Sequence, residues 1–205
     1  WRMEQESYNL FHTMQLHDAQ GKRLYLTADE RRAFMAAAAK AERPVRTFCA
    51  VLHDTGCRIS EALALTPERI DLSGRAVVFG TLKKRRQGVY RAVPVPPGLL
   101  DQLDLVHGLQ EAQKRGKGHA DRLLWPWARN TAWRRVKAVM EAAGITDGPH
   151  RSPKGLRHGY GVHAISAGVP LNMLSKWMGH ATLEVTAIYA NALGAEEQGI
   201  AARMW

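Results

Sequence analysis

The spacing of apolar residues is helical over most of the chain. Thr27 and Glu30 have the spacing of a capping box, and the alanine-rich run after them strongly favours a helix. A second apolar helix is expected over residues 46–54, because Gly56 just after it suits a left-handed helix cap. A third, short helix is expected from about Ile59, in the run ISEALAL.

The period changes from helix to strand in the middle of the chain. Residues 75–80 and 89–95 are rich in β-forming residues, and the run LKKRRQG separates them. This pattern predicts a β-hairpin with a basic tip. The second strand should lie at a sheet edge, because three prolines close it: Pro94, Pro96 and Pro97.

Helical spacing returns after the hairpin. One helix is expected over residues 98–114, followed by the basic loop QKRGKGHADR. The segment 130–143 is amphipathic, and its apolar side is expected to be buried: Trp133, Val136, Val139 and Met140. Its basic residues lie off that side: Arg134, Arg135 and Lys137. Gly144 should end this helix.

Three more helices are expected in the last third of the chain. A helix should start at Ser152 and the proline after it, and should run to Gly168. Two shorter helices should follow, one over residues 170–178 and one from Thr182 that carries Tyr189. These elements predict an α+β fold, a mostly helical domain with one small antiparallel β-sheet.

Composition adds a charge signal. The 205 residues include 29 Lys and Arg against 19 Asp and Glu, which gives a formal net charge of +10. Such an excess favours a polyanionic partner, because cations that neutralise phosphates release condensed counterions. Charge alone does not separate a nucleic-acid-binding protein from a merely basic soluble protein.

The chain shows no sign of export. Cys49 and Cys57 are its only cysteines, and their apolar, helical surroundings predict two buried thiols, as in a reducing cytosol. No run approaches about 18 apolar residues and no signal peptide opens the chain, so a cytoplasmic location is expected. Because the first residue is Trp1, we expect a piece of a longer or processed protein. Residues 1–26 have no clean period and are expected to form a lead-in or linker.

Basic residues and one tyrosine carry the candidate chemistry. Cleaving a phosphodiester without a metal needs a nucleophile, cations near the phosphoryl oxygens and an acid for the leaving oxygen. His158 and His163 come nearest to a metal-ligand pair, but a spacing of five does not place them on one helix face. The sequence has no glycine-rich loop of the Walker type.

Four segments resemble the characteristic boxes of the tyrosine recombinase (phage integrase) family, and they stand in the family's order. They are TGCRISEALAL, TLKKRRQGVYRAVPVP, KGLRHGYGVHAI and LSKWMGHATLEVTAIYAN. Each segment alone is a weak signal, but together they span the chain from about Thr27 to Asn191. The resemblance implies an integrase-type catalytic domain over residues 27–192. The tail over residues 193–205 would either dock on a neighbouring protomer or form a packed or frayed end.

The same resemblance implies the catalytic residues. The nucleophile would be Tyr189, nine residues after His180. Arg58 and Arg157 would hold the non-bridging oxygens together with His180, and Lys83 would protonate the leaving 5′ oxygen. The product of cleavage would be a 3′-phosphotyrosyl intermediate, whose rejoining requires no metal, ATP or other cofactor.

One position departs from the family's pattern. Lys154 stands where the family usually has histidine. A cation there can contact the phosphate, but it is a poor general base, since free lysine titrates near ~10.4. We therefore expect Lys154 to stabilise charge, and the identity of the base stays open.

The resemblance also implies duplex DNA as the partner. The protein would bind two duplexes as a tetramer and would be a monomer in the absence of DNA. Eight residues are expected to contact the DNA: Lys84, Arg85, Arg86, Arg134, Arg135, Lys137, Arg151 and His158. The implied activity is DNA integration or recombination, typical of mobile genetic elements.

Ordinary structural roles compete with each of these interpretations. Arg58 could simply pair with Glu61, His180 could cap a helix, and Tyr189 could be a core residue. Lys84 competes with Lys83 for the acid. At the level of function, the alternatives are a type IB topoisomerase, a non-catalytic DNA-binding regulator and a metal-dependent nuclease.

Overall fold

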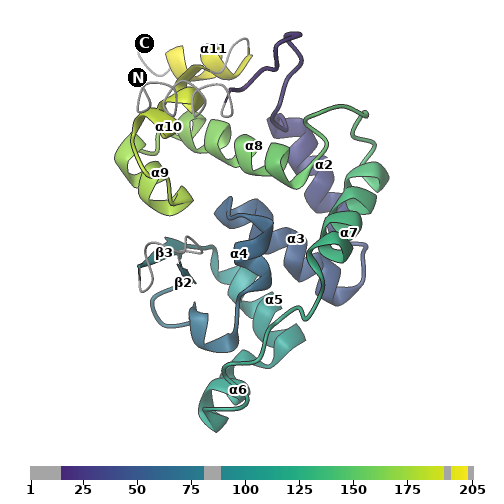
Figure 1. Ribbon diagram of the computed structural model, residues 1–205, viewed down its shortest axis with the longest axis vertical. Coiled ribbons are helices and arrows are strands. Elements are labelled where there is room, and N and C mark those ends of the chain that lie inside the picture. The colour runs from purple at the N-terminus through teal and green to yellow at the C-terminus, as the bar shows by residue number, and fades with distance from the viewer. Residues whose placement is uncertain (1–14, 81–88, 192–194, 203–205) are drawn as a thin grey trace, which may run out of the picture.

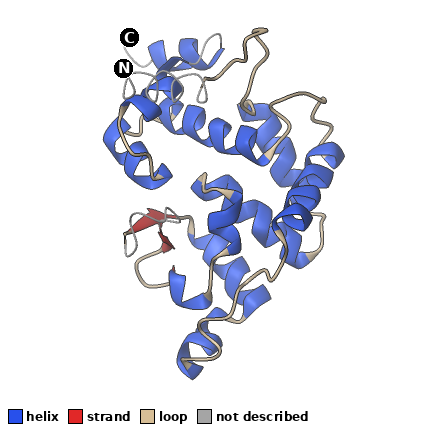
Figure 2. Ribbon diagram, viewed as in Figure 1, coloured by secondary structure: helices blue, strands red, loops and turns tan. Residues whose placement is uncertain are grey.

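The computed structural model describes residues 15–80, 89–191 and 195–202. These residues are mostly helical, and their small antiparallel sheet lies at one side of the molecule (Figures 1 and 2). The α+β fold expected from the sequence is confirmed. No helix within these ranges is long and apolar enough to cross a bilayer.

The first helices begin and end at their sequence signals. Helix α2 (Ala28–Ala38) starts after Thr27, which forms the expected capping box. Helix α3 (Arg43–Thr55) ends at Gly56, whose φ of 59° is left-handed, as predicted. It starts three residues earlier than expected, because the proline in its first turn needs no hydrogen-bond partner for its nitrogen. Helix α4 (Ile59–Leu63) follows directly.

The predicted hairpin is also present. Strand β2 (Ala76–Gly80) pairs antiparallel with β3 (Tyr90–Pro94), and the buried Val77 and Val93 are opposite each other. A two-residue strand, β1 (Ile70–Asp71), flanks β2 on its other side, so β3 is an edge strand, as its proline requires. The sequence does not predict β1, because two residues are too few to show an alternation.

Two helices follow the sheet, where the sequence predicts a single helix over residues 98–114. They are α5 (Pro97–His107) and α6 (Leu109–Arg115). The prediction is wrong because the chain turns at Gly108, which has a left-handed φ of 62°. The turn carries Leu109 into the core.

Helix α7 (Arg129–Ala142) forms as predicted, but it buries a slightly different face. Three of the four apolar residues lie in the core as expected: Val136, Val139 and Met140. The prediction for Trp133 is wrong, because its side chain is 44% exposed and Ala132 is buried instead. Successive residues of a helix turn by about 100°, which leaves Trp133 roughly 60° from Val136, at the margin of the buried face.

The last elements are grouped around α8 (Pro153–Ser166) (Figure 1). Ser152 caps this helix as predicted, since its side chain accepts a hydrogen bond from the Gly155 N–H at 3.1 Å. Helix α9 (Leu171–Met178) forms as predicted. The helix expected from Thr182 begins two residues later as α10 (Glu184–Ala187) and continues as a 3-10 helix, η2 (Ile188–Asn191), which carries Tyr189.

Buried side chains form two clusters. The larger one fills the space between the helices and the sheet, and Phe34, Phe48 and Trp125 are among its members. The smaller one lies against α8 and joins the two ends of the described chain, because Leu16, Tyr25 and Tyr189 share it. Helix α11 (Ala195–Ala201) also lies against α8 (Figure 1).

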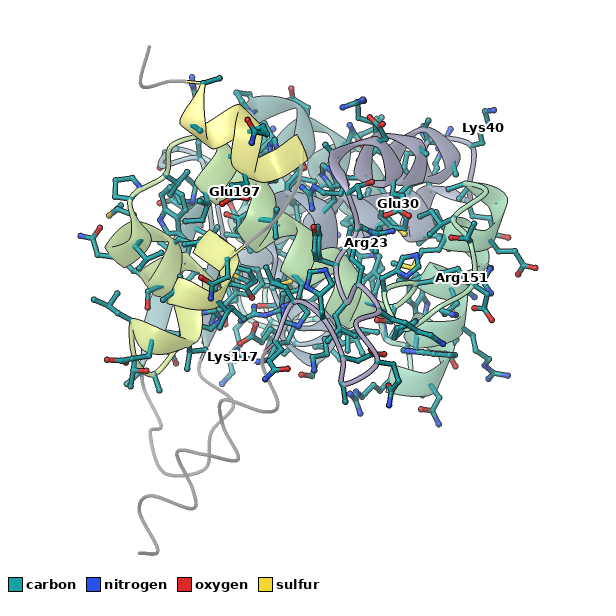
Figure 3. The ribbon with its side chains drawn as sticks, turned by 90° about the horizontal axis from the view of Figure 1, so that it is seen from above. Arg23, Glu30, Lys40, Lys117, Arg151 and Glu197 are labelled. Carbon is teal, nitrogen blue, oxygen red and sulfur yellow. The ribbon has the colours of Figure 1, made fainter. Side chains whose placement is uncertain are left out.

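The segment before α2 is held by an ion pair as well as by packing. Arg23 donates two hydrogen bonds to the Glu30 carboxylate, at 2.5 and 2.7 Å (Figure 3). His150 lies 3.5 Å from the same carboxylate. This segment therefore lies beside the loop that leads into α8. The predicted domain boundaries after residues 26 and 192 stay predictions.

Candidate active site

Arg58 leaves the turn that joins α3 to α4. Gly56 is required in this turn, because its φ is left-handed and a Cβ there would lie 2.3 Å from the Tyr160 ring. Arg58 pairs with Glu61 as the structural alternative predicts, at 3.1 Å, and its backbone N–H donates to the same carboxylate at 2.8 Å. Its side chain nevertheless remains 39% exposed, which leaves guanidinium surface for a ligand.

Glu61 also binds a second arginine, which the sequence analysis did not single out. Arg91 on β3 donates to both carboxylate oxygens, at 3.2 and 2.8 Å, and its Nε donates to the Trp177 carbonyl at 2.7 Å. Burial alone would raise the pKa of Glu61, but hydrogen bonds and charges from Arg91 and Arg58 outweigh it and hold the pKa below its usual value. This buried pair fixes the sheet against α4 and α9.

Arg157 lies inside the molecule and bridges two separate segments. Its two terminal nitrogens donate to the carbonyls of Gly56 and Met178, at 2.6 and 2.7 Å. Burial and the nearby Arg58 lower the pKa of Arg157 to about 10, so it is still a cation at neutral pH. The arginine therefore connects the α3–α4 turn to the end of α9.

Tyr189 lies on η2 with its side chain fully buried. Its ring packs directly on α8 at Gly161, where a Cβ would lie 2.6 Å from the ring atoms. Its hydroxyl lies 3.3 Å from Nδ1 of His158. Burial raises the pKa of Tyr189 to about 12, against the opposing charges of Arg157 and Arg58.

Two imidazole rings lie against the tyrosine. His180 stacks on the Tyr189 ring at 6.0 Å between centroids, and its Nδ1 lies 2.8 Å from the Thr186 hydroxyl. Burial, then Arg157 and Arg58, lower the pKa of His180 to about 3. Burial, then Lys154 and Arg157, lower the pKa of His158 to about 3. Both rings are therefore neutral at pH 7.

The sequence places these residues in a known family. Residues 24–196 match the description "Phage integrase family". The chain belongs to the phage integrase family. Tyrosine recombinase XerD of Mycobacterium tuberculosis is 35% identical over 150 residues, which are 70% of this chain and 46% of that protein. XerD of Pseudomonas aeruginosa is 33% identical over 168 residues, 77% of this chain and 53% of that protein. The chain spans about half the length of the curated relatives it matches.

Solved structures show the same fold at lower sequence identity. The XerA recombinase superposes with a TM-score of 0.72 at 20% identity, covering 88% of this chain and 64% of that chain. The XerH site-specific recombinase bound to its difH substrate gives 0.69 at 19% identity, with 92% and 59% covered. The catalytic domain of bacteriophage HP1 integrase gives 0.59 at 21% identity, with 86% and 93% covered.

Within this integrase fold, most of the predicted catalytic residues come together. Arg157 is bonded to the turn that carries Arg58 and to the residue two positions before His180, which stacks on Tyr189. Lys154 is exposed in the first turn of α8, one turn before this group. Lys83 and its neighbours at the hairpin tip (Lys84, Arg85 and Arg86) lie outside the described residues.

The predicted DNA contacts of the integrase do not form one surface. Lys137 donates to the Arg151 carbonyl at 2.7 Å and so lies beside the loop before α8, and Arg134 is exposed three residues earlier on α7. Arg135 lies on another side of α7, where its guanidinium is 4.5 Å above the Trp127 ring and 3.5 Å from Glu42.

His158 departs furthest from its predicted position. Only 2% of it is exposed, so in this conformation its ring cannot reach a duplex, and the expected surface position is wrong. The reason is its place on α8. Arg157 points to the α3–α4 turn, and the next residue, about 100° further around the helix, points to Tyr189.

Proposed function

We propose that this chain cleaves and rejoins duplex DNA with Tyr189 as its nucleophile, as a site-specific recombinase of the integrase family. The observation that carries the proposal is the convergence of Arg58, Arg157, His180 and Tyr189 from three distant segments. A packed core does not need two arginines and two histidines around one tyrosine. Membership of the phage integrase family supports the same activity.

In the proposed reaction, the Tyr189 oxygen attacks the scissile phosphate and the 5′ oxygen leaves, which gives a 3′-phosphotyrosyl intermediate. Arg58 and Arg157 bind the non-bridging oxygens, since planar guanidinium groups match phosphate geometry. Arg157 uses two of its five N–H donors on backbone carbonyls, so three remain for the phosphate. Lys83 protonates the leaving oxygen, and Lys154 adds positive charge at the start of α8.

His180 is suited to donate a hydrogen bond to the phosphate. If the Thr186 hydroxyl donates to Nδ1 of His180, the ring proton lies on Nε2. This Nε2 is buried and has no hydrogen-bond partner among the described residues. A phosphoryl oxygen would supply the missing acceptor and would gain a donor that is already oriented.

Attack requires the elements that cover Tyr189 to open, because a phosphate cannot reach the hydroxyl of a fully buried side chain. The elements that carry the tyrosine are short: four residues in α10 and four in η2. The free protein therefore represents a resting state, and DNA binding must supply the free energy that uncovers the tyrosine hydroxyl beside His158.

Duplex DNA is the proposed partner, approached from the side of α7 and the start of α8. Lys137 donates to the Arg151 carbonyl before α8, Lys154 is exposed in the first turn of α8, and Arg134 is exposed on α7. We propose that the basic residues 84–86 add to this contact. The XerH structure named above contains its difH DNA substrate, which supports this class of partner. We further propose a catalytic domain over residues 27–192, a tetramer on two duplexes and a docking tail over residues 193–205.

Covalent trapping on nicked duplexes tests the proposal. A duplex pool enriched by binding to the protein is nicked near each candidate site, so that the cleaved fragment diffuses away and the adduct accumulates. The chain should form a denaturant-resistant DNA adduct, and Tyr189→Phe should form none while it still binds. An adduct with Tyr189→Phe would reject the nucleophile. Loss of the adduct in EDTA would favour a metal-dependent nuclease, and supercoil relaxation without strand exchange would favour a topoisomerase.

A further inference from the structure

His158 makes the closest polar contact to the proposed nucleophile. It directly follows Arg157 on α8, and its ring centroid lies 5.8 Å from that of Tyr189. Its Nδ1 lies 3.3 Å from the tyrosine hydroxyl, which makes no other hydrogen bond within the described part of the chain. A residue that merely fills space could be apolar, so a buried imidazole in this place calls for a chemical reason.

The hydrogen bond between Tyr189 and His158 can run in either direction, and one direction suits the proposed reaction. In that direction the phenol donates its single proton to an Nδ1 that carries none. The ring proton of a neutral His158 then lies on Nε2, which is buried without a partner among the described residues. In this assignment a nitrogen lone pair points at the proton that Tyr189 must lose before it attacks.

We propose that His158 is the general base of this chain, accepting the phenolic proton of Tyr189 during strand cleavage. The inference rests on the proposed function. The Oη–H bond of Tyr189 breaks as its proton moves to Nδ1 of His158, and the electron pair left on Oη forms the bond to phosphorus. The bond from phosphorus to the 5′ oxygen breaks, and that oxygen takes its proton from the separate acid, Lys83. Rejoining reverses both transfers, and His158 returns its proton to Tyr189.

The charges around His158 favour proton transfer only when DNA is present. The charges of Lys154 and Arg157 on α8 act on His158, the charge of Arg58 in the α3–α4 turn acts on Tyr189, and the neutral His180 stacks on the Tyr189 ring. In the free protein the pKa of His158 is about 3 and that of Tyr189 about 12, chiefly through burial, so the phenol keeps its proton. A scissile phosphate adds negative charge beside these cations, which stabilises an imidazolium.

This assignment also accounts for Lys154. The lysine is exposed in the first turn of α8, four residues before His158. The buried ring of His158, in contrast, already touches the hydroxyl. Base and charge stabiliser would thus be two different residues on the same face of α8.

His158→Asn separates a base from a mere hydrogen-bond acceptor. The asparagine amide occupies nearly the position of Nδ1 and can accept the phenolic hydrogen bond, but it cannot hold a proton. Single-turnover cleavage of a nicked duplex should be about 10²–10⁴-fold slower at pH 7. The rate should then rise with pH by about tenfold per unit, since hydroxide must remove the proton. The matched control is His163→Asn on the exposed side of the same helix, which should cleave at the unmodified rate.

The outcomes distinguish this inference from the proposed function. If the unmodified chain forms no covalent adduct, the proposed function fails. If it does, and His158→Asn cleaves at the same rate with the same pH profile, only the assignment of His158 fails.

A measurement on the unmodified chain covers the case in which His158→Asn does not fold. Nitrogen-15 spectra of the histidine rings should show a proton on Nε2 and none on Nδ1 of His158. The Nδ1 signal should shift in Tyr189→Phe, which removes the donor. A proton on Nδ1 in the free protein would overturn the inference.

Discussion

Arg91 and Glu61, thirty positions apart in the sequence, form a buried ion pair whose two hydrogen bonds measure 2.8 and 3.2 Å. The same carboxylate holds Arg58, so one side chain positions both an arginine of the proposed site and the sheet edge next to it. Lys83 precedes β3 in the sequence. The pair thus fixes the strand that follows the predicted basic tip.

Glu61→Ala should strongly destabilise the fold. It leaves Arg91 buried without a counter-ion, and breaking a buried pair costs about 3–5 kcal/mol. Denaturant unfolding monitored by circular dichroism measures this loss. The control is Glu111→Ala, which removes an exposed pair with Arg115 and should cost less than about 1 kcal/mol. Similar losses for the two variants would contradict the argument.

Trp133→Ala should weaken DNA binding without destabilising the protein. The exposed ring contributes little to the core, so the free energy of unfolding should change by no more than about 0.5 kcal/mol. Trp125→Ala, which removes a fully buried ring, should cost about 3–5 kcal/mol. Binding is measured across a salt series. An apolar contact predicts a lower affinity with an unchanged salt dependence, and unaltered affinity would place Trp133 away from the DNA.

Arg134→Ala and Arg135→Ala should differ, although the residues are neighbours. Arg134 is exposed, whereas Arg135 is held by Trp127 and Glu42. We expect the larger loss of DNA affinity for Arg134→Ala, measured on cognate and scrambled duplexes. A loss of about 1–3 kcal/mol on the cognate duplex alone would indicate a base contact. An equal loss on both, with a salt slope lower by about one, would indicate a phosphate contact.

Lys83→Ala should slow cleavage, and a 5′-bridging phosphorothioate should largely restore its rate, because a sulfur leaving group needs no proton. Cleavage of the sulfur-containing and ordinary nicked duplexes is compared for Lys83→Ala and Lys84→Ala. Rescue of Lys84→Ala alone would move the acid by one residue. Rescue of neither variant would place the acid elsewhere.

The buried histidine should make folding sensitive to mild acid. The pKa of His158 falls from about 6.5 in an unfolded chain to about 3 in the fold. Between these values the unfolded chain binds a proton that the fold excludes, so stability is complete above pH 6.5 and declines as pH falls toward 3. The slope from this residue is about 1.4 kcal/mol per pH unit. Denaturant unfolding at several pH values should show a shallower slope for His158→Asn, and an unchanged slope would refute the prediction.

The sequence predicts those features that depend on residues adjacent in the chain. The caps at Thr27 and Ser152 and the left-handed turn at Gly56 are local, and each lies at the predicted residue. The order of the boxes also indicates which residues would share the site.

Features that depend on tertiary contacts could not be predicted in this way. Helical spacing alone does not decide whether Trp133 or Ala132 faces the core, because that depends on the space available there. The Arg91–Glu61 pair joins a strand to a helix across thirty residues. The contact between His158 and Tyr189 depends on the rotation of α8 relative to η2, about which the spacing of charged residues carries no information.

The packing of Tyr189 against Leu16 and Tyr25 implies a trade-off between heat resistance and speed. A DNA phosphate reaches Tyr189 only if part of this cluster opens and gives up buried area, so the cutting state is the less stable one. Substitutions that tighten the cluster should raise the melting temperature and make a slower enzyme. Selection for faster variants should in turn yield more heat-labile proteins, with the changes concentrated at the segment before α2 as well as around the nucleophile.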